Sequence, residues 1–525
     1  MRNIIHLIIQ CFSCILCMMF FALQIVIAQD EAPMRVHIES FDIQGNTVVS
    51  THILEKVLND YMSKYFPDAM LNFSDMQVLT DRISLIYKEK GYFLARCYIP
   101  RQDIQNGVLQ LRVAEGILDK IKVTGNKYYS ENLLKGFFKV DPPDYVINER
   151  HLEKSLLLVN DLPKNETELL LTKGEKKGSV DIVLKNNDQS AHQFQLSYNN
   201  YGAENISKSR YSLSGQITDP FGGMTLFLKG ISGEDPSDLF IGYANLDIPV
   251  NYYGTYVGFS FIKSSSQLGQ ELAVLSIEGQ TEMYGTTIKH PIVLKRDMRI
   301  NAQLGFFHTS SETTAWESVS IGTYQLNSIK TSLDLDMVDH FFGKTRGQCT
   351  YQVSFVDKGP NIEKTNKAFQ KVSLSGSRIQ RIKQYSQLVF RMNGQWSSDD
   401  LIPLDQMAIG GYEAVRGHLP SAYLGDIGYN FSMEWMFSPP GSEITFFGHP
   451  LSELIQGGIF VDHGGIRLNN EPEIGLQTKA LTGYGLGLRL FYRNYFSCFT
   501  DIAFPVSPEE DQDNVVFYFS AQGTF

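Results

Sequence analysis

The chain has few cysteines for its 525 residues, and their spacing does not suit cross-links. Its six cysteines are Cys11, Cys14, Cys17, Cys97, Cys349 and Cys498. The last three are far apart and odd in number, and no pair among them has the spacing of a zinc site, which also argues against a disulfide framework. We therefore expect no metal site and no cofactor, and single cysteines that are buried or face lipid.

Positive charge and catalytic motifs are also scarce. The net charge is −11 and the sequence pI is near 5.5, which argues against nucleic acid as a partner. We find no nucleophile-elbow, zinc-protease, Walker or dinucleotide motif, since Gly485-Leu486-Gly487 holds only two glycines within an alternating strand. The eleven histidines are scattered. The sequence therefore predicts no catalytic site and no enzyme.

Long apolar runs are confined to the N-terminus. Residues 4–27 form a mostly apolar run that follows a basic start and is followed by Ala28. This pattern predicts a signal peptide over residues 1–28. The run is also long enough to span a bilayer, so an uncleaved anchor is the alternative. No later run is long enough for a membrane-spanning helix. The mature chain is then exported, and is either soluble or embedded in a membrane as a β-barrel.

Aromatic residues and glycine are abundant, with 26 Tyr, 34 Phe and 43 Gly, which favours β structure. From residue 193 to 525 short segments alternate apolar and polar side chains, as in Phe194/Leu196/Tyr198 and Leu486/Leu488/Leu490. Segments of this kind predict a transmembrane barrel, and about 330 residues leave room for roughly sixteen antiparallel strands. The fold class is thus mostly β.

The last segment alternates up to a terminal Phe525. This pattern resembles the signal read by the machinery that assembles outer-membrane barrels. We therefore expect that machinery and outer-membrane lipid as partners. A soluble β-sandwich with such a terminus would leave an exposed, aggregation-prone edge.

Two copies of a β-α-α-β-β module precede the barrel, over residues 36–115 and 116–187. The pairs Gly45/Gly125, Asn46/Asn126 and Ser50/Ser130 are each offset by eighty residues. In the first copy we expect Ser50 to cap one helix and Ser74 to start another. Strands are predicted at residues 92–99 and 108–113.

The first copy carries a motif over some twenty-five residues, which resembles the first POTRA domain of two-partner secretion translocators, the ShlB/FhaC/HecB family. Its residues are Gly91, Tyr92, Ala95, Pro100, Gln102, Gly107, Glu115 and Gly116. The resemblance implies that these periplasmic modules bind an unfolded client by offering sheet edges. The alternative is that they are spacers.

A glycine-rich stretch, residues 410–418, places Arg416 between small residues, and Asp462 follows in a second strand-like run. An isolated Val-Arg-Gly is most simply a surface turn, although an arginine and an aspartate inside one barrel would pair well. The family resemblance implies a loop between the eleventh and twelfth strands that folds into the lumen. It assigns the pore-loop motif to Val415, Arg416, Gly417 and His418, and the barrel-wall partner to Phe460, Asp462 and Gly464.

His418 replaces the family's tyrosine, and we interpret it as a packing substitution; a pH-sensitive role is the alternative. Some family members carry an N-terminal plug helix. Here only residues 29–35 separate the predicted cleavage site from the first strand, so gating is expected to depend on the loop around Arg416.

The sequence therefore predicts a translocator in a bacterial outer membrane, with its N-terminal modules in the periplasm. It would recruit an unfolded secreted exoprotein, such as a β-helical adhesin or a cytolysin, and export it through the barrel. One alternative is an assembly factor for outer-membrane proteins, which generally has three or more modules. Others are a passive porin, which needs no paired modules, and a surface adhesin.

Overall fold

The computed structural model describes residues 34–139, 145–176, 178–316, 319–359, 367–438, 444–446, 448–470, 477–508 and 512–525. The predicted signal peptide and the cysteines Cys11, Cys14 and Cys17 lie outside these residues. The chain forms two compact units. The first comprises residues 1–122, 140–152 and 170–183, and the second the remainder. This division cuts through the second predicted module, so the domain boundaries near residues 115 and 187 stay predictions.

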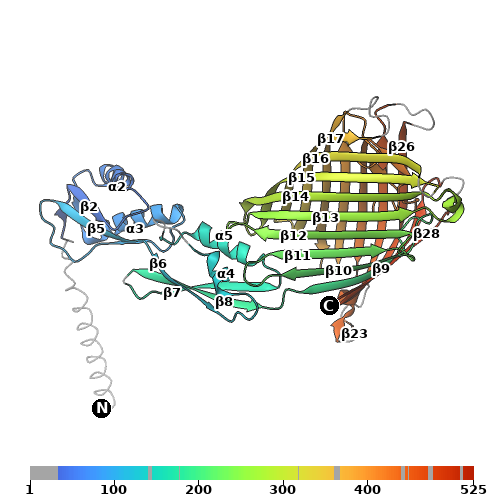
Figure 1. Ribbon diagram of the computed structural model, residues 1–525. Helices are drawn as coiled ribbons and strands as arrows, with labels where there is room; N and C mark the ends of the chain where they lie inside the picture. The colour runs from blue at the N-terminus through green and yellow to red at the C-terminus, as the bar shows by residue number, and fades with distance from the viewer. Residues whose placement is uncertain are drawn as a thin grey trace, which may run out of the picture. The chain divides into compact units, whose positions relative to one another are not determined.

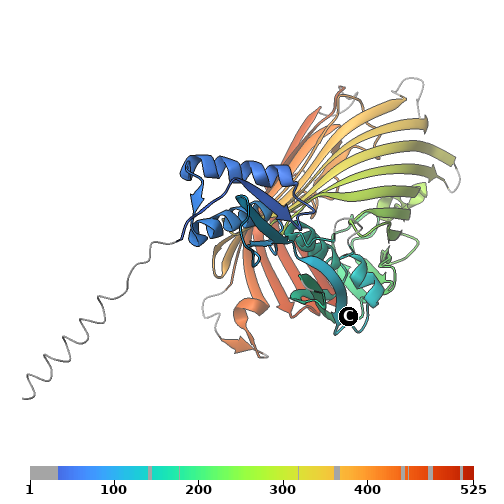
Figure 2. The same cartoon turned by 90° about the vertical axis from the view of Figure 1, so that its left-hand side faces the viewer.

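The first module is a small sheet covered by two helices (Figure 2). Its elements are β1 (Val36–His37), β2 (Ser40–Gln44), α2 (Thr51–Tyr65), β3 (Met70–Leu71), α3 (Phe73–Glu89), β4 (Arg96–Tyr98) and β5 (Val108–Ala114). The sheet order is β2-β5-β4, with β2 parallel to β5 and β4 antiparallel to it. Alternate residues of β5 are buried, and Leu109 and Leu111 share one core with Leu54 and Ile83 of the helices.

Two local predictions in this module were wrong. Helix α3 starts at Phe73, with Asn72 as its cap, and not at Ser74. Asn72 prevails because the Asp75 carboxylate accepts a hydrogen bond from the Asn72 backbone N–H and so completes a capping box. The strand predicted from residue 92 begins only at Arg96, because the chain first turns after Gly91, whose φ is +90°.

The second module repeats the order, with β6 (Ile117–Thr124), α4 (Glu131–Gly136), α5 (Glu149–Val159), β7 (Asn165–Lys173) and β8 (Ser179–Asp188). Its sheet order is β6-β8-β7. The Ser130 side chain accepts a hydrogen bond from Leu133 N and caps α4. Ser50 occupies the cap position of α2 without such a bond.

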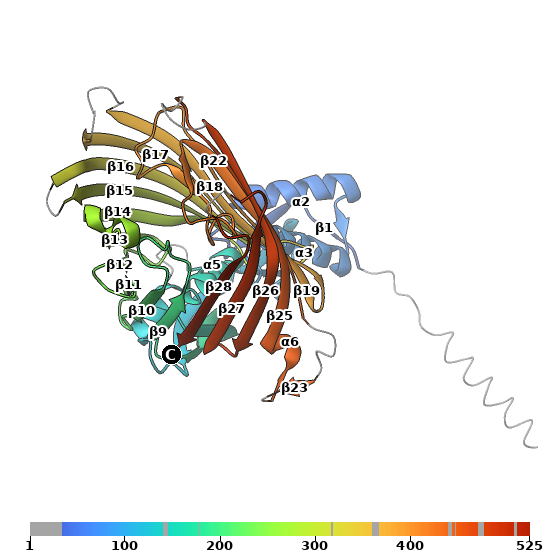
Figure 3. The same ribbon diagram turned by 90° about the vertical axis from the view of Figure 1, so that its right-hand side faces the viewer.

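The second unit contains a closed barrel of sixteen antiparallel strands, as predicted (Figures 1 and 3). They are β9 (Gln193–Asn199), β10 (Arg210–Thr218), β11 (Thr225–Ser232), β12 (Leu239–Pro249), β13 (Tyr256–Gln267), β14 (Glu278–Leu294), β15 (Met298–Ala315), β16 (Val319–Val338), β17 (Gly343–Lys358), β18 (Ala368–Lys383), β19 (Ser386–Trp396), β22 (Ile427–Phe437), β25 (Ile455–Arg467), β26 (Thr478–Tyr492), β27 (Phe496–Pro505) and β28 (Val516–Thr524). We call the end at which β9 begins the inner end, and the other the outer end.

Strand length varies strongly around the barrel. β16 has 20 residues, whereas β9 has 7 and β28 has 9. The short pair β9 and β28 closes the barrel. Apolar side chains such as Leu333, Tyr351 and Leu488 are exposed on the outer face, which suits a wall that meets lipid.

Short elements lie in the connections. They are η1 (Gln270–Leu275), the hairpin β20 (Met407–Ile409) and β21 (Tyr423–Gly425), the hairpin β23 (Thr445–Phe446) and β24 (His449–Pro450), and α6 (Leu451–Leu454). Within the described part of the chain, no helix is both long and apolar enough to cross a membrane. The described cysteines form no disulfide. Cys97 is buried, Cys498 is half-buried and Cys349 is exposed. Burial raises the pKa of the Cys97 thiol to about 12.

Candidate functional site

The site is built by residues 397–426, which connect β19 to β22 at the outer end and which we call the lumenal loop. These strands are the eleventh and twelfth of the barrel. The hairpin β20–β21 carries a tip, residues 410–418, into the lumen. Gly410, Gly411 and Gly417 have φ values of +101°, +85° and +94°, which glycine adopts without strain. The glycines therefore permit the sharp turns that aim Arg416 at the wall.

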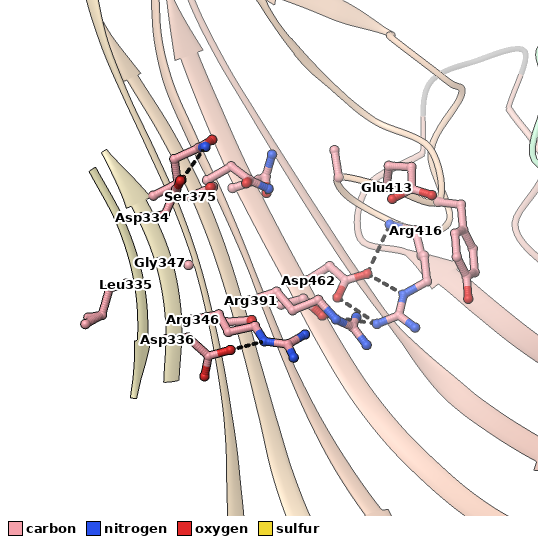
Figure 4. A pocket seen from close by; sticks show the side chains of 18 of the residues that line it. Asp334, Leu335, Asp336, Arg346, Gly347, Ser375, Arg391, Glu413, Arg416 and Asp462 are labelled. Carbon is pink, nitrogen blue, oxygen red and sulfur yellow. Dashed lines mark hydrogen bonds and ion pairs between the residues drawn. The ribbon is translucent and has the colours of Figure 1, made fainter. Parts of the chain in front are cut away.

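Arg416 forms a bidentate contact with Asp462 of β25 (Figure 4). Its Nε donates to Asp462 Oδ2 at 2.7 Å and its Nη2 to Oδ1 at 3.0 Å, while the Arg416 backbone N–H also donates to Oδ2 at 3.1 Å. The guanidinium carbon lies 3.3 Å from the centre of the Phe460 ring. Arg416 is 2 % exposed and Asp462 1 %. A charge pair this buried is shielded little by salt and holds the tip firmly.

A second arginine joins the site, and the sequence did not reveal it. Arg489 of β26 donates from Nη2 to Glu434 Oε1 of β22 at 2.7 Å, and it forms two hydrogen bonds with Asp501 of β27. Asp501 Oδ2 also accepts from Arg416 Nη1 at 3.2 Å. Three buried carboxylates thus share two buried arginines, which satisfies charges that would otherwise be costly to bury.

Lumen-facing glycines make room for this cluster. Gly483, Gly485 and Gly487 alternate along β26. A Cβ at Gly483 would collide with the carbonyl oxygen of Arg416, and one at Gly485 with the Phe460 ring. A Cβ at Gly464 of β25 would lie only 3.1 Å from Val415 Cγ2. The period-two glycine repeat was visible in the sequence and marks where the loop backbone approaches the wall.

The remaining motif residues pack the tip. Val415 is fully buried in an apolar cluster with Ile409, Ile466 and Leu481. The Gly417 backbone N–H donates to the Tyr518 hydroxyl at 3.1 Å. His418 Nε2 donates to the Thr482 carbonyl at 2.9 Å, and its side chain is buried.

Beside the tip lies a cavity of about 630 Å³ within the lumen (Figure 4). Polar side chains of β16 and β17 form its far side. Asp336 accepts from Arg346 Nε at 3.1 Å, and Asp334 accepts from Gln348 Nε2 at 2.7 Å. The loop therefore narrows the lumen and leaves a polar space next to it. Among the described residues, no group of three or more His, Cys, Asp or Glu is arranged to hold a metal ion.

In the first module, Glu115 closes the turn between β2 and α2. Its carboxylate accepts from the backbone N–H groups of Thr47 at 2.7 Å and Val48 at 3.1 Å, and from the Tyr87 hydroxyl at 2.7 Å. Burial and this hydrogen bond to Glu115 raise the Tyr87 pKa. In the second module Asp188 accepts from Lys127 N and Tyr128 N, eighty residues beyond Thr47 and Val48. The repeat therefore reuses one carboxylate-closed turn.

The other motif residues of the first module also shape its backbone. Gly91, Gly107 and Gly116 have φ values of +90°, +67° and +78°. Gln102 pairs its side-chain amide with the Gln110 backbone through two hydrogen bonds of 2.8 Å, and so continues the sheet beyond β4. Tyr92 N donates to Tyr87 O, Ala95 is fully buried, and Pro100 leads out of β4. These residues stabilise the fold of the described module. Their contact with a client protein remains a prediction.

Phe525 lies where the barrel closes. Its backbone N–H and carbonyl pair with Phe194 of β9 at 2.8 and 3.1 Å, while its side chain is exposed. Phe525 therefore forms the last backbone pair between β28 and β9, the two strands that close the barrel. Its role as an assembly signal stays a prediction.

The haemolysin secretion/activation family model ShlB/FhaC/HecB matches residues 178–490, and the ShlB-type POTRA model matches residues 36–116. The heme/hemopexin transporter protein HuxB of Haemophilus influenzae is 22% identical over 92% of this chain and 86% of its own length. The hemolysin transporter protein ShlB of Serratia marcescens is 24% identical over 74% of this chain and 69% of its own. The structure of CdiB from Escherichia coli shares the fold, with a TM-score of 0.74, 18% identity and coverage of 95% of this chain and 92% of that one.

Proposed function

Because this chain belongs to the haemolysin secretion/activation family ShlB/FhaC/HecB, we propose that it exports an unfolded secreted protein across the bacterial outer membrane by two-partner secretion. The N-terminal modules then face the periplasm. The observation that carries the proposal is the lumenal loop, which is held by Arg416 inside a sixteen-stranded barrel preceded by two modules. A passive porin has no use for the two modules.

The modules offer sheet edges to an extended client. Among the described strands, β2 pairs with β5 alone, so the other side of β2 has no strand partner. An edge strand presents backbone N–H and C=O groups that pair with any client sequence. We propose that the client adds a strand at such an edge before it enters the barrel. The periplasm holds no nucleotide, so folding of the client outside the cell supplies the driving force.

The same proposal includes two further partners, outer-membrane lipid and the barrel assembly machinery. The exposed apolar side chains of the outer barrel face contact outer-membrane lipid. The β28 strand that ends at Phe525 is read by the barrel assembly machinery during insertion. Removal of Phe525 should then lower the amount of inserted barrel without changing the export rate per inserted molecule.

The test is reconstitution in vesicles with the exoprotein encoded by the neighbouring gene. Wild type should move it, and a variant that lacks residues 36–115 should lose recruitment while its barrel still conducts ions. Failure of folded wild-type protein to move any candidate exoprotein would contradict the proposal. Insertion of other outer-membrane proteins in the same assay would favour the assembly-factor alternative.

A further inference from the structure

The lumenal loop makes a second charged contact with the barrel, away from Arg416. Asp405 lies in the limb that runs from β19 to the tip. Its Oδ1 is 2.9 Å from Lys371 Nζ of β18, and it accepts a hydrogen bond of 2.9 Å from Gln352 Nε2 of β17. Its backbone carbonyl accepts from Lys371 Nζ at 2.8 Å and from Gln395 Nε2 of β19 at 3.0 Å. One loop residue therefore receives contacts from three neighbouring strands.

This ion pair is much less hydrated than the Arg346–Asp336 pair in the same lumen. The side chains of Lys371 and Asp405 are each 12% exposed, whereas Arg346 and Asp336 are 65% and 41% exposed. Water screens an exposed pair such as Arg346–Asp336, and such a pair contributes little to stability. A buried pair such as Lys371–Asp405 costs more free energy to separate, because each charge would lose its buried partner.

Neighbouring contacts fix the same limb on both sides of Asp405. Leu401 is buried with Leu326, Val356 and Phe369 of strands β16, β17 and β18. The Asp426 carboxylate accepts from Leu401 N at 2.9 Å and from Gln406 Nε2 at 3.0 Å. The limb is thus attached to strands β16–β19, while the tip is attached to β22 and β25–β28.

We infer that Asp405 and Lys371 are positioning residues that form a second anchor of the lumenal loop, independent of Arg416. When the tip contact opens, this anchor keeps the first limb on strands β17–β19, so that the tip swings about Asp405 and the loop stays in the barrel. The anchor follows from contacts alone; only its consequence during export rests on the proposed function.

Single-cysteine reporters test the two attachments separately. Cys97, Cys349 and Cys498 are first replaced by serine. Val415→Cys then reports on the tip and Leu401→Cys on the limb, since both side chains are buried. The probe is a membrane-impermeant maleimide applied to the purified protein in lipid vesicles. Because no client is present, failure of this test and failure of the export proposal are distinguishable.

Arg416→Ala should speed labelling at position 415 and leave position 401 protected. Asp405→Asn alone should do the reverse, and the double variant should expose both positions. We expect each exposed position to react at least about tenfold faster, which corresponds to about 1.4 kcal/mol. Since each single variant tests one attachment, the inference remains falsifiable if the double variant does not fold.

Matched variants separate the anchor from a general loss of charge. Lys371→Met should behave like Asp405→Asn, and Lys371→Arg should keep position 401 protected. Asp336→Asn removes a carboxylate from a lumenal ion pair on β16 and should change neither reporter. Exposure of position 401 by Arg416→Ala alone, or continued protection of position 401 in folded Asp405→Asn, would overturn the inference.

Discussion

Strands β25–β27 and strands β16–β18 face the same lumen but hold the loop by opposite means. On the first set, glycines let the loop backbone approach the wall, and short acidic side chains meet Arg416 there. On the second set, the long side chains of Lys371 and Gln352 reach into the lumen and hold Asp405 of the limb. The short acidic side chains hold the tip in a buried, rigid contact close to the wall. The long side chains of Lys371 and Gln352 hold the limb through a longer and more flexible connection. The difference teaches that the tip and the limb need not move together.

The largest effect is expected when the rigid contact is broken by Arg416→Ala. Asp462 would lose its main partner while buried, and removal of one member of a buried pair costs about 3–5 kcal/mol. Single-channel recordings in planar bilayers should show small, noisy wild-type currents that change character in the variant. A large, steady conductance in both proteins would mean that the loop does not narrow the pore.

Arg489→Met should have the next largest effect on the same wall. Glu434 and Asp501 would lose Arg489 but keep Arg416, and Glu434 also keeps Arg391 at 3.3 Å. Because both carboxylates keep a partner, we expect a total loss of about 1.5–3 kcal/mol, the size of one hydrogen bond to a charged group. Urea unfolding in lipid vesicles should register the destabilisation, while the Arg416–Asp462 contact persists in the bilayer recordings. Stability equal to wild type would show that the cluster does not need its second arginine.

Gly483→Ala tests close approach without removing a charge. The added Cβ would collide with the Arg416 carbonyl oxygen, and overpacking of this kind costs about 1–3 kcal/mol. Its matched control is Gly347→Ala on β17, where the nearest atom to the added Cβ is 3.6 Å away. Unfolding midpoints should separate the two variants. Equal midpoints would indicate that the wall yields at Gly483.

The smallest effect is expected for Asp336→Asn on β16. Its partner Arg346 is largely exposed, so solvent screening limits the contribution of the pair to about 0.5 kcal/mol or less. Urea unfolding and channel currents should both match wild type. A loss comparable to that of Arg489→Met would mean that ion pairs on the two sets of strands are equivalent.

Sequence patterns predicted the elements of this fold better than its contacts between strands. The alternation at Phe194, Leu196 and Tyr198 sufficed to locate a strand because lipid-facing side chains recur every second residue. The cap at Asn72 was missed because both Asn72 and Ser74 are suitable capping residues, and only the side chain of Asp75 decides between them.

The site was predictable only where a motif carried it. Arg416 and Asp462 could be paired through the family resemblance, although they lie on separate strands. Arg489 and Asp501 have no motif, and their contact depends on the register of β26 against β27, which pairs Gly487 with Asp501. Asp405 and Lys371 depend likewise on how the loop folds back. The glycines Gly483, Gly485 and Gly487 were a local signal for that face, but we interpreted Gly485 and Gly487 only as part of an alternating strand and did not consider Gly483.

The unequal strands also set the hydrophobic thickness that the barrel presents. The 7 residues of β9 rise about 24 Å at roughly 3.4 Å each, and tilt shortens this further. A typical bilayer has a hydrocarbon core of about 30 Å, so the mismatch falls beside β9 and β28 and not beside β16. Lipids along that side must compress or tilt to cover the wall. Reconstitution should therefore be more efficient in short-chain than in long-chain phosphatidylcholine, and equal yields would indicate that the lipids meet a band of uniform height.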